Sequence, residues 1–289
     1  LQLHPRAVTR GAPAVLRVVR EKPGIETFGG KSRTLRQKAD RIMAVQALLM
    51  ACGHAEPRMR YARQTLLPEV GTQGQARLGA ARVLIVGAGG LGSAVLPLLA
   101  GAGVGHLRII DPDRVEETNL HRQTLYRMAD LGQPKAEVAA RELAALNPDC
   151  QVSARVARLE PGLARGELPG CDLVVDAADA FAVTYALSDL CHAAGKPLVS
   201  ASVLGRAGYV GGFCGGAPSL RAVFPDLPGR LGSCAADGVM GPVVATLGAL
   251  QAQMALAVLL GHPQAHIGSS GQQARVWVLQ SQSGQFVQS

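Results

Sequence analysis

Short apolar runs alternate with amphipathic stretches through the middle of the chain. The apolar runs predict buried strands at residues 83–86, 106–111, 171–178 and 197–203, with a more exposed strand at 151–159. Helical spacing lies between these runs, at residues 92–103, 134–146 and 181–194, after a short predicted helix at 73–78. Strands that alternate with helices favour an α/β fold with a doubly wound, mainly parallel sheet.

The C-terminal part of the chain departs from this alternation. Residues 209–214 predict a strand that pairs antiparallel with a neighbour, and residues 275–279 with 285–287 predict a terminal hairpin. A loop rich in proline and glycine is predicted at 223–237, before a long apolar helix at 242–261. We therefore expect antiparallel strands at the C-terminal edge of the sheet.

Glycines follow the first predicted strand at a spacing that suits a nucleotide. In Gly87-x-Gly89-x-x-Gly92, the first glycine permits a tight turn, the second lets a phosphate approach the backbone, and the third lets the next helix pack closely. That helix directs its positive end at an anion. Asp111 ends the second strand about 20 residues on and can bind ribose hydroxyls. The pattern predicts a Rossmann-like adenine-nucleotide site and leaves NAD, FAD and ATP open.

Further charged residues fall where the same site is expected. Asp176 and Asp179 follow another buried strand, and the carboxyl ends of parallel strands share one edge of a sheet. Lys135 lies in the first turn of the helix that Pro134 opens, where the helix dipole disfavours a cation. An anion nearby would offset this cost. The strand ends therefore predict one polar site.

Charge divides the chain into unequal parts. Its 289 residues carry a net charge of +8, and residues 1–58 hold eleven Lys/Arg against four Asp/Glu. The rest is nearly neutral, which argues against a nucleic-acid-binding body. We interpret residues 1–58 as a basic, disordered extension, with a partner-docking arm or a targeting leader as alternatives. Residues 59–262 are then the nucleotide-binding domain, and 263–289 a C-terminal tail with the hairpin.

Composition also indicates where in the cell the protein is located. The longest apolar stretch, 243–260, is interrupted by Gln251 and Gln253, so we expect no membrane association. The six cysteines are scattered without a C-x-x-C pair, which favours reduced thiols over a disulfide framework. We expect a cytoplasmic protein.

Seven motifs occur in order along the chain. They are R-Y-x-R-Q at 60–64, G-x-G-G-L-G at 87–92, D-x-D at 111–113, T-N-L-x-R-Q at 118–123, G-Q-P-K at 132–135, D-x-x-D at 176–179 and C-x-x-x-G-V-x-G-P at 234–242. In this set the chain resembles the ubiquitin-activating-like adenylyltransferases of sulfur-carrier proteins. Those are the bacterial enzymes of molybdopterin and thiamine-thiazole synthesis. The resemblance spans about residues 59–261.

The resemblance implies a reaction and its participants. The C-terminal glycine carboxylate of a ubiquitin-like sulfur carrier ending in Gly-Gly attacks the α-phosphate of Mg-ATP, and pyrophosphate leaves. The barrier of this step lies mostly in positioning two anions and stabilising phosphoryl charge. A homodimer is implied, with a sulfurtransferase or cysteine desulfurase as a further partner.

The resemblance also assigns residues. Four glycines pack against the nucleotide: Gly87, Gly89, Gly90 and Gly92. The remaining nucleotide contacts are Asp111 at the ribose with Asp113 beside it, and Asn119, Arg122 and Lys135 at the triphosphate. Asp179 binds Mg²⁺, Arg63 reaches into the partner subunit's site, and Cys234 accepts sulfur or links to the carrier. As the catalytic set we name Arg63, Arg122, Lys135, Asp179 and Cys234.

Two departures from the family pattern keep alternatives open. Residues 215–223 lack the C-x-x-C pair of zinc-binding relatives and no cysteine follows Cys234, so we predict no structural zinc. Ala180 stands where relatives have Asn, with Thr184 as a nearby substitute. The alternatives are a non-catalytic scaffold that binds carrier or nucleotide, a tRNA-modifying cyclase, and an NAD-dependent oxidoreductase.

Overall fold

The computed structural model describes residues 59–225, 238–262, 276–280 and 285–288. The chain divides into two compact units, Leu1–Glu56 and Pro57–Ser289, and every described residue belongs to the second. The predicted basic extension lies outside the described residues, as do most of the predicted loop at 223–237 and residues 263–275 of the predicted tail.

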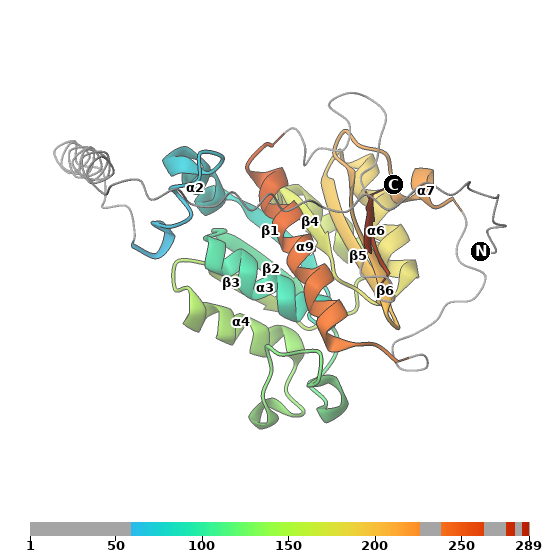
Figure 1. The fold of residues 1–289 in the computed structure, drawn as a ribbon. Helices are drawn as coiled ribbons and strands as arrows, with labels where there is room; N and C mark the ends of the chain where they lie inside the picture. Colours follow the sequence, from blue (N-terminus) through green and yellow to red (C-terminus); the bar gives the residue numbers. More distant parts are fainter. Residues whose placement is uncertain (1–58, 226–237, 263–275, 281–284, 289) are drawn as a thin grey trace, which may run out of the picture. The chain divides into compact units, whose positions relative to one another are not determined.

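An eight-stranded sheet runs through the described part of the second unit, in the order β3-β2-β1-β4-β5-β6-β7-β8 (Figure 1). In chain order the strands are β1 (Arg82–Val86), β2 (His106–Ile110), β3 (Gln151–Arg155), β4 (Leu173–Asp176), β5 (Pro197–Leu204), β6 (Ala207–Cys214), β7 (Val276–Gln280) and β8 (Gln285–Gln288). Neighbours from β3 to β5 pair in parallel, and neighbours from β5 to β8 pair antiparallel. The predicted Rossmann-like sheet with antiparallel C-terminal strands is confirmed.

Helices cover both faces of this sheet. They are α2 (Gly71–Ala80), α3 (Gly90–Ala102), α4 (Lys135–Leu146), α5 (Pro161–Glu167), α6 (Phe181–Ala193), α7 (Leu220–Val223) and α9 (Gly241–Leu259). Short 3-10 helices lie at Met59–Tyr61, Glu117–Asn119, Met128–Asp130 and Leu168–Gly170. Figure 1 shows α3, α4 and α9 over one face of the sheet and α6 over the other. The fold is therefore a three-layer sandwich with two cores.

The alternation of side chains along β1 explains why there are two cores. Val83 and Ile85 belong to the core beneath α3, α4 and α9, whereas Leu84 and Val86 belong to the core beneath α6. A strand that is buried on both faces is apolar throughout, as its sequence is. The end of β1 then lies in the middle of the sheet, between β2 and β4.

Helix α9 is, among the described helices, the one long and apolar enough to cross a membrane by length and composition. Its packing accounts for that composition, because it contacts α3 and strands β4, β5 and β6. Gln251, fully buried in its middle, donates from Nε2 to the backbone oxygens of Asp176 at 2.6 Å and Val199 at 3.2 Å. The helix therefore links the end of β4 to the neighbouring strand β5.

Two of the differences from the predicted elements lie at β3 and directly after it. Helix α5 was not predicted, because seven residues that begin Pro-Gly give no recognisable period. Strand β3 ends at Arg155 rather than at residue 159. Residues 157–159 consequently leave the sheet and line the pocket described next.

Candidate active site

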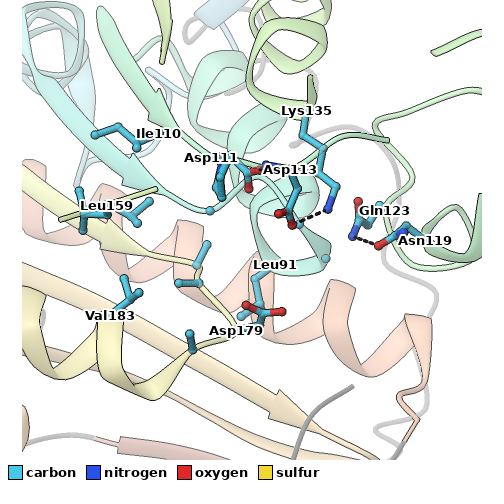
Figure 2. A pocket seen from close by; sticks show the side chains of 18 of the residues that line it. Leu91, Ile110, Asp111, Asp113, Asn119, Gln123, Lys135, Leu159, Asp179 and Val183 are labelled. Atoms are coloured by element: carbon cyan, nitrogen blue, oxygen red, sulfur yellow. Dashed lines mark hydrogen bonds and ion pairs between the residues drawn. The ribbon is translucent and has the colours of Figure 1, made fainter. Parts of the chain in front are cut away.

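A cavity of about 320 Å³ opens at the carboxyl ends of the parallel strands. Its walls come from the loops after β1, β2, β3 and β4, the end of β5, and Val244 of α9. Figure 2 shows apolar side chains at one end, from Ile110, Leu159 and Val183. Lys135, Asn119 and Gln123 lie toward the other end, with aspartates between. The cavity thus has an apolar end and a polar, cationic end.

The glycine loop lines this cavity at the start of α3. Gly87 has a φ of 98°, and a Cβ there would lie 2.5 Å from the backbone oxygen of Ala177. A Cβ on Gly92 would overlap the backbone oxygen of Gly87, which lets the helix begin directly against the loop. Gly92 lies beneath the cavity wall, whereas Gly87, Gly89 and Gly90 line it. Gly87 and Gly92 are therefore required by the fold itself.

Gly89 and Gly90 differ in what surrounds them. A Cβ on Gly90 would lie 2.8 Å from the Val244 side chain of α9. A Cβ on Gly89 would meet no atom closer than Gln123 Nε2, at 3.7 Å. The protein therefore leaves space at Gly89, beside the positive end of α3, where a bound anion would fit.

Asp111 is buried at the end of β2 and braces the glycine loop. Its Oδ2 accepts from the backbone N–H of Ala88 at 2.7 Å, and its Oδ1 from that of Asp113 at 2.8 Å. Burial raises the pKa of Asp111, and the bonds from Ala88 and Asp113 oppose this. Each carboxylate oxygen keeps a second lone pair, so binding of a ribose hydroxyl remains chemically open.

Lys135 has an anion beside it within the protein. Its Nζ lies 3.1 Å from Asp113 Oδ2, and its side chain is only 6% exposed, whereas that of Asp113 is 61% exposed. The unfavourable helix position of Lys135 predicts an anion nearby, and Asp113 provides one. The position of Lys135 therefore does not by itself require a phosphate. The ammonium nevertheless lines the cavity, where a ligand can reach it.

Arg122 and Asn119 meet on the cationic side. Arg122 donates to the backbone oxygen of Thr118 at 3.2 Å and to Asn119 Oδ1 at 3.4 Å. Within the described ranges, no carboxylate forms an ion pair with Arg122. Its guanidinium charge is therefore available to an anionic ligand in the cavity that it lines.

The two acids after β4 have different environments. Asp179 is exposed and lines the cavity. Asp176 is fully buried below it, where it accepts from Ser200 Oγ at 2.8 Å and from the backbone N–H of Ala178 at 3.2 Å. Burial raises the pKa of Asp176 to about 6, against hydrogen bonds from Thr184, Ser200 and Ala178. Asp176 is therefore structural, and Asp179 faces the cavity.

Thr184 does not lie where it could replace the missing Asn. It is buried on α6, hydrogen-bonds Asp176, and donates to the backbone oxygen of Ala180 at 3.5 Å. It does not line the cavity, whereas Ala180 does. The expectation that Thr184 substitutes is therefore wrong, because its hydroxyl is used in holding the turn after β4.

Two predicted residues lie away from this cavity. Arg63 is exposed on the segment before α2, whose neighbour Gln64 donates to the backbone oxygen of Ala102 at the C-terminal end of α3. Since the cavity is at the first turn of α3, a 13-residue helix about 20 Å long separates the two. Arg63 is thus remote from the cavity of its own chain. Cys234 lies outside the described residues.

Several lining residues were not assigned from sequence. Gln123 stands in the T-N-L-x-R-Q motif but received no role, and Arg158, Leu159 and Ser202 lie where β3 and β5 end. Their position at carboxyl strand ends was the available signal. Across the described residues, no three His, Cys, Asp or Glu side chains gather as a metal-ligand cluster. A cation here would need ligand oxygens beyond the protein's own.

Comparisons place the chain among known proteins. A model of the ThiF family matches residues 61–287. The sulfur carrier protein adenylyltransferase of Thermus thermophilus is 46% identical over 210 residues, which are 70% of this chain and 78% of that protein. The SAMP-activating enzyme E1 of Haloferax volcanii is 40% identical over 208 residues, covering 71% and 77%. The resemblance drawn from the seven motifs is confirmed.

A longer relative and solved structures extend this result. The adenylyltransferase and sulfurtransferase UBA4 of Yarrowia lipolytica is 44% identical over 205 residues, 70% of this chain. The chain spans about half of that protein, 52% of its length. E. coli MccB, solved with ATP, matches at a TM-score of 0.64 and 23% identity over 80% of this chain and 71% of that one. PaaA matches at 0.65 and 19%, over 91% and 86%. The structural matches show the shared fold.

Proposed function

The chain belongs to the ThiF family, and we propose that it is an ATP-dependent adenylyltransferase that acts on the C-terminal glycine of a ubiquitin-like sulfur-carrier protein. One observation carries the proposal. Three charged groups face one cavity at the start of α3: the guanidinium of Arg122, which has no carboxylate partner among the described residues, the ammonium of Lys135 and the exposed carboxylate of Asp179. A triphosphate with a divalent cation needs such groups, whereas a dinucleotide leaves them unexplained.

The two ends of the cavity suit the parts of ATP. Adenine fits the apolar end near Ile110, Leu159 and Val183, and the ribose hydroxyls then come near Asp111. The phosphates would approach the room at Gly89 and the first backbone N–H groups of α3. Arg122 and Lys135, with Asn119, border that position. In this pose Lys135 would exchange Asp113 for a phosphate oxygen.

The carboxylates fit a magnesium ion bound together with ATP. Mg²⁺ is usually held by one or two carboxylates and by phosphate oxygens, and Asp179 lines the cavity with an exposed carboxylate. A bound Mg²⁺ would neutralise charge on the phosphates. Asp179 would fix its position relative to Arg122 and Lys135. No side chain of the chain has to move a proton in this assignment.

The proposed step is a displacement at the α-phosphorus. An oxygen of the carrier's glycine carboxylate forms a bond to that phosphorus, and the bond to the bridging oxygen of the β-phosphate breaks. Pyrophosphate leaves with the bonding electrons, and an acyl-adenylate remains. Arg122 and Lys135 would stabilise the charge that develops on the phosphoryl oxygens. The attacking carboxylate is already ionised, so the chain supplies positioning and charge.

A homodimer is part of the proposal. Arg63 lies about one helix length from the cavity of its own chain, so it can serve catalysis only from a second copy. Leu66 and Leu67, close to it in sequence, are 63% and 52% exposed. Apolar surface of this kind suits a subunit interface. Arg63 of each subunit would then act in its partner's site.

The remaining assignments complete the proposal. Cys234 would accept sulfur or link to the carrier, with a sulfurtransferase or cysteine desulfurase as sulfur donor. The carrier would belong to molybdopterin or thiamine-thiazole synthesis. We place the protein in the cytoplasm, without a nucleic-acid or membrane partner and without structural zinc.

A second candidate is a scaffold of the same fold that binds carrier or nucleotide without catalysis. Ala180 favours it, since the cavity presents a methyl group at the position where the family resemblance implies the amide of an asparagine. The scaffold would bind ATP but would not exchange pyrophosphate. The two candidates therefore differ in one measurable property.

Exchange of labelled pyrophosphate into ATP tests the proposal. The wild-type chain, mixed with candidate carriers that end in Gly-Gly, should exchange only with a matching carrier. Lys135→Ala and Asp179→Ala should reduce exchange at least about 100-fold by removing phosphate or metal contacts. Arg108→Ala, whose side chain is 54% exposed and does not line the cavity, is the control and should keep full exchange. ATP binding without exchange for every carrier would leave only the scaffold.

A further inference from the structure

Helices α3 and α9 have no charged side chain. Neither the 13 residues of α3 nor the 19 residues of α9 include Asp, Glu, Lys, Arg or His. Other helices expose charged residues on their outward sides, such as Glu137 and Arg141 on α4 and Asp189 on α6. A helix at the surface of a soluble protein usually presents polar and charged residues to water. The composition of α3 and α9 is therefore that of helices with a second covered side.

Within the described part of the chain, the sheet covers only one side of these two helices (Figure 1). In the most apolar 18-residue window of α9, 39% of the residues are buried. On the outward side, Leu98 of α3 is 45% exposed, and Ala249 and Gln253 of α9 are exposed. The helices touch each other, since a Cβ on Gly248 would lie 2.7 Å from the Cβ of Ala94. Their outward residues therefore form one uncharged surface, which we call the α3–α9 face.

Both helices run from the cavity toward the segment before α2. Gly90 of α3 and Val244 of α9 lie in the first turns of their helices and line the cavity. At the other end of α3, the backbone oxygen of Ala102 accepts a hydrogen bond from Gln64 at 3.0 Å. Directly after α9, Leu260 packs against α2. The cavity and the segment before α2 therefore lie at opposite ends of one pair of parallel helices.

A second copy of the chain is the partner that this arrangement fits. A two-fold axis across the middle of α3 and α9 reverses their direction in the partner. The C-terminal ends of one helix pair then lie at the N-terminal ends of the other, which brings each Arg63 toward the partner's cavity. We propose that the α3–α9 face is the homodimer interface, with the two copies of these helices packed antiparallel. The proposal rests on the adenylyltransferase function proposed above, in which Arg63 acts from the second copy.

The observations favour a second copy over a membrane surface. An amphipathic helix that lies on a membrane is rich in Lys and Arg, and α3 and α9 have neither. To span a membrane, α9 would have to leave the sheet, yet Gln251 ties it to the backbone oxygens of Asp176 and Val199. The exposed side chains of Ala245 and Ala249 are small, which lets another helix approach closely.

Ala249→Arg tests the proposal, because Ala249 is exposed near the middle of α9. A residue near a two-fold axis lies close to its own copy, so two arginines there would repel each other. In analytical ultracentrifugation we expect the mass of a dimer for the wild type and that of a monomer for Ala249→Arg. Pyrophosphate exchange should fall at least about 100-fold in the variant, because each site then lacks the arginine from the partner.

Two further variants separate a lost interface from a folding defect. Ala193→Arg makes the same change at an exposed position of α6, on the other face of the sheet, and should remain a dimer with full exchange. Ala249→Glu should be monomeric by itself. Mixed with Ala249→Arg, it should restore both the dimer and exchange, because opposite charges then meet at the axis. A folding defect in either variant would not be repaired by mixing.

The outcomes separate this proposal from the proposed function. A dimeric Ala249→Arg chain overturns the α3–α9 face as the interface, whether or not the wild type exchanges pyrophosphate. Monomeric variants that stay monomeric when mixed overturn the antiparallel crossing near Ala249. A monomeric wild type also overturns the proposal, and its sedimentation with phosphatidylcholine–phosphatidylglycerol vesicles would identify a membrane as the cover. Masses as expected, with no exchange by the wild type, support the interface and overturn the adenylyltransferase.

Discussion

Two glycines of the loop after β1 differ in whether the protein leaves space for a side chain. Gly87 has a left-handed backbone, and a side chain there would strike the Ala177 backbone. Gly89 has space around its Cα within the chain. The fold therefore explains why residue 87 is a glycine. Packing within the chain does not explain why residue 89 is one, and a bound ligand would.

Alanine at each position should separate these roles. Gly87→Ala should lower the free energy of unfolding by ~2–4 kcal/mol, through strain and a backbone clash. Gly89→Ala should change it by less than about 1 kcal/mol but weaken ATP binding about tenfold or more, because the methyl group fills the room beside α3. Urea denaturation and calorimetry with Mg-ATP measure the two effects. Wild-type ATP affinity in Gly89→Ala would show that no phosphate approaches that backbone.

Asp176 should make stability depend on pH. Burial raises its pKa to about 6, whereas a solvated aspartate has about 3.8. Between these values the folded state holds a proton that the unfolded state has lost, so the stabilisation is complete below pH 4 and is lost as pH rises through 6. Two pKa units correspond to ~3 kcal/mol. The groups that face the carboxyl, from Ser200, Thr184 and Ala178, are neutral.

Asp176→Asn isolates this contribution. The amide cannot titrate, so the free energy of unfolding of the wild type minus that of the variant should rise by ~3 kcal/mol from pH 7 to pH 4. Taking the difference cancels the carboxylates that both proteins share. Urea denaturation at several pH values measures it. A difference that stays constant across this range would mean that Asp176 has the same pKa in both states.

Single residues show which parts of the site can be predicted from the sequence. The glycine spacing and the acid after β2 are local patterns, and the structure brings them to one cavity. The partner of Lys135 is Asp113, 22 positions earlier, and the hydroxyl of Thr184 is engaged with Asp176 and Ala180. Such pairings depend on which side chains meet across elements. A linear pattern does not contain that information.

At the scale of elements, α7 is attached to α6 by a cluster of side chains at the surface. Arg221 donates to Asp189 from Nε at 2.7 Å and from a second nitrogen at 2.9 Å, and lies 4.8 Å above the Tyr185 ring. The Tyr185 hydroxyl donates to the backbone oxygen of Phe224 at 2.8 Å. These contacts hold the last described residues before position 226.

Removing the guanidinium should loosen α7 locally. Asp189 and Arg221 are about half exposed, so their ion pair contributes little to global stability. Arg221→Ala should therefore shift the melting temperature by no more than a few degrees, yet speed hydrogen exchange at the amides of Ala222 and Phe224. Arg221→Lys, which keeps the charge but not the paired geometry, should also speed exchange. Unchanged exchange in both variants would show that backbone bonds alone hold α7.

Most helices and strands could be predicted from the sequence. Strands buried on both faces are continuous apolar runs, and α4 begins directly after a proline, so both leave clear local signals. Helix α5 is short and lacks a period, and β3 is exposed along most of its length, which hides its end. These two boundaries matter because the residues after β3 line the cavity.

At the scale of the whole molecule, the position of Arg63 is the observation that supports the proposed homodimer. Its segment is anchored to the C-terminal ends of α3 and α4, through Gln64 to Ala102 and Tyr61 to Asn147. The cavity lies at the opposite ends of those helices. A two-fold dimer that joins unlike ends of two subunits would bring each Arg63 to the other's cavity.

Mixing two inactive variants tests this arrangement. Arg63→Ala and Asp179→Ala should each lose pyrophosphate exchange. The first variant lacks the arginine that enters the partner's site, and the second lacks the proposed metal ligand. In a mixed dimer, the subunit that keeps Asp179 receives the wild-type arginine of its partner. One of the two sites of this dimer is therefore complete. Random reassociation makes about half of the dimers mixed, and activity should return to about one quarter of the wild-type value. Equal subunit amounts and mild denaturant allow the exchange of subunits. If Arg63 served its own chain, every site in the mixture would lack one group, and the mixture would stay as inactive as its components.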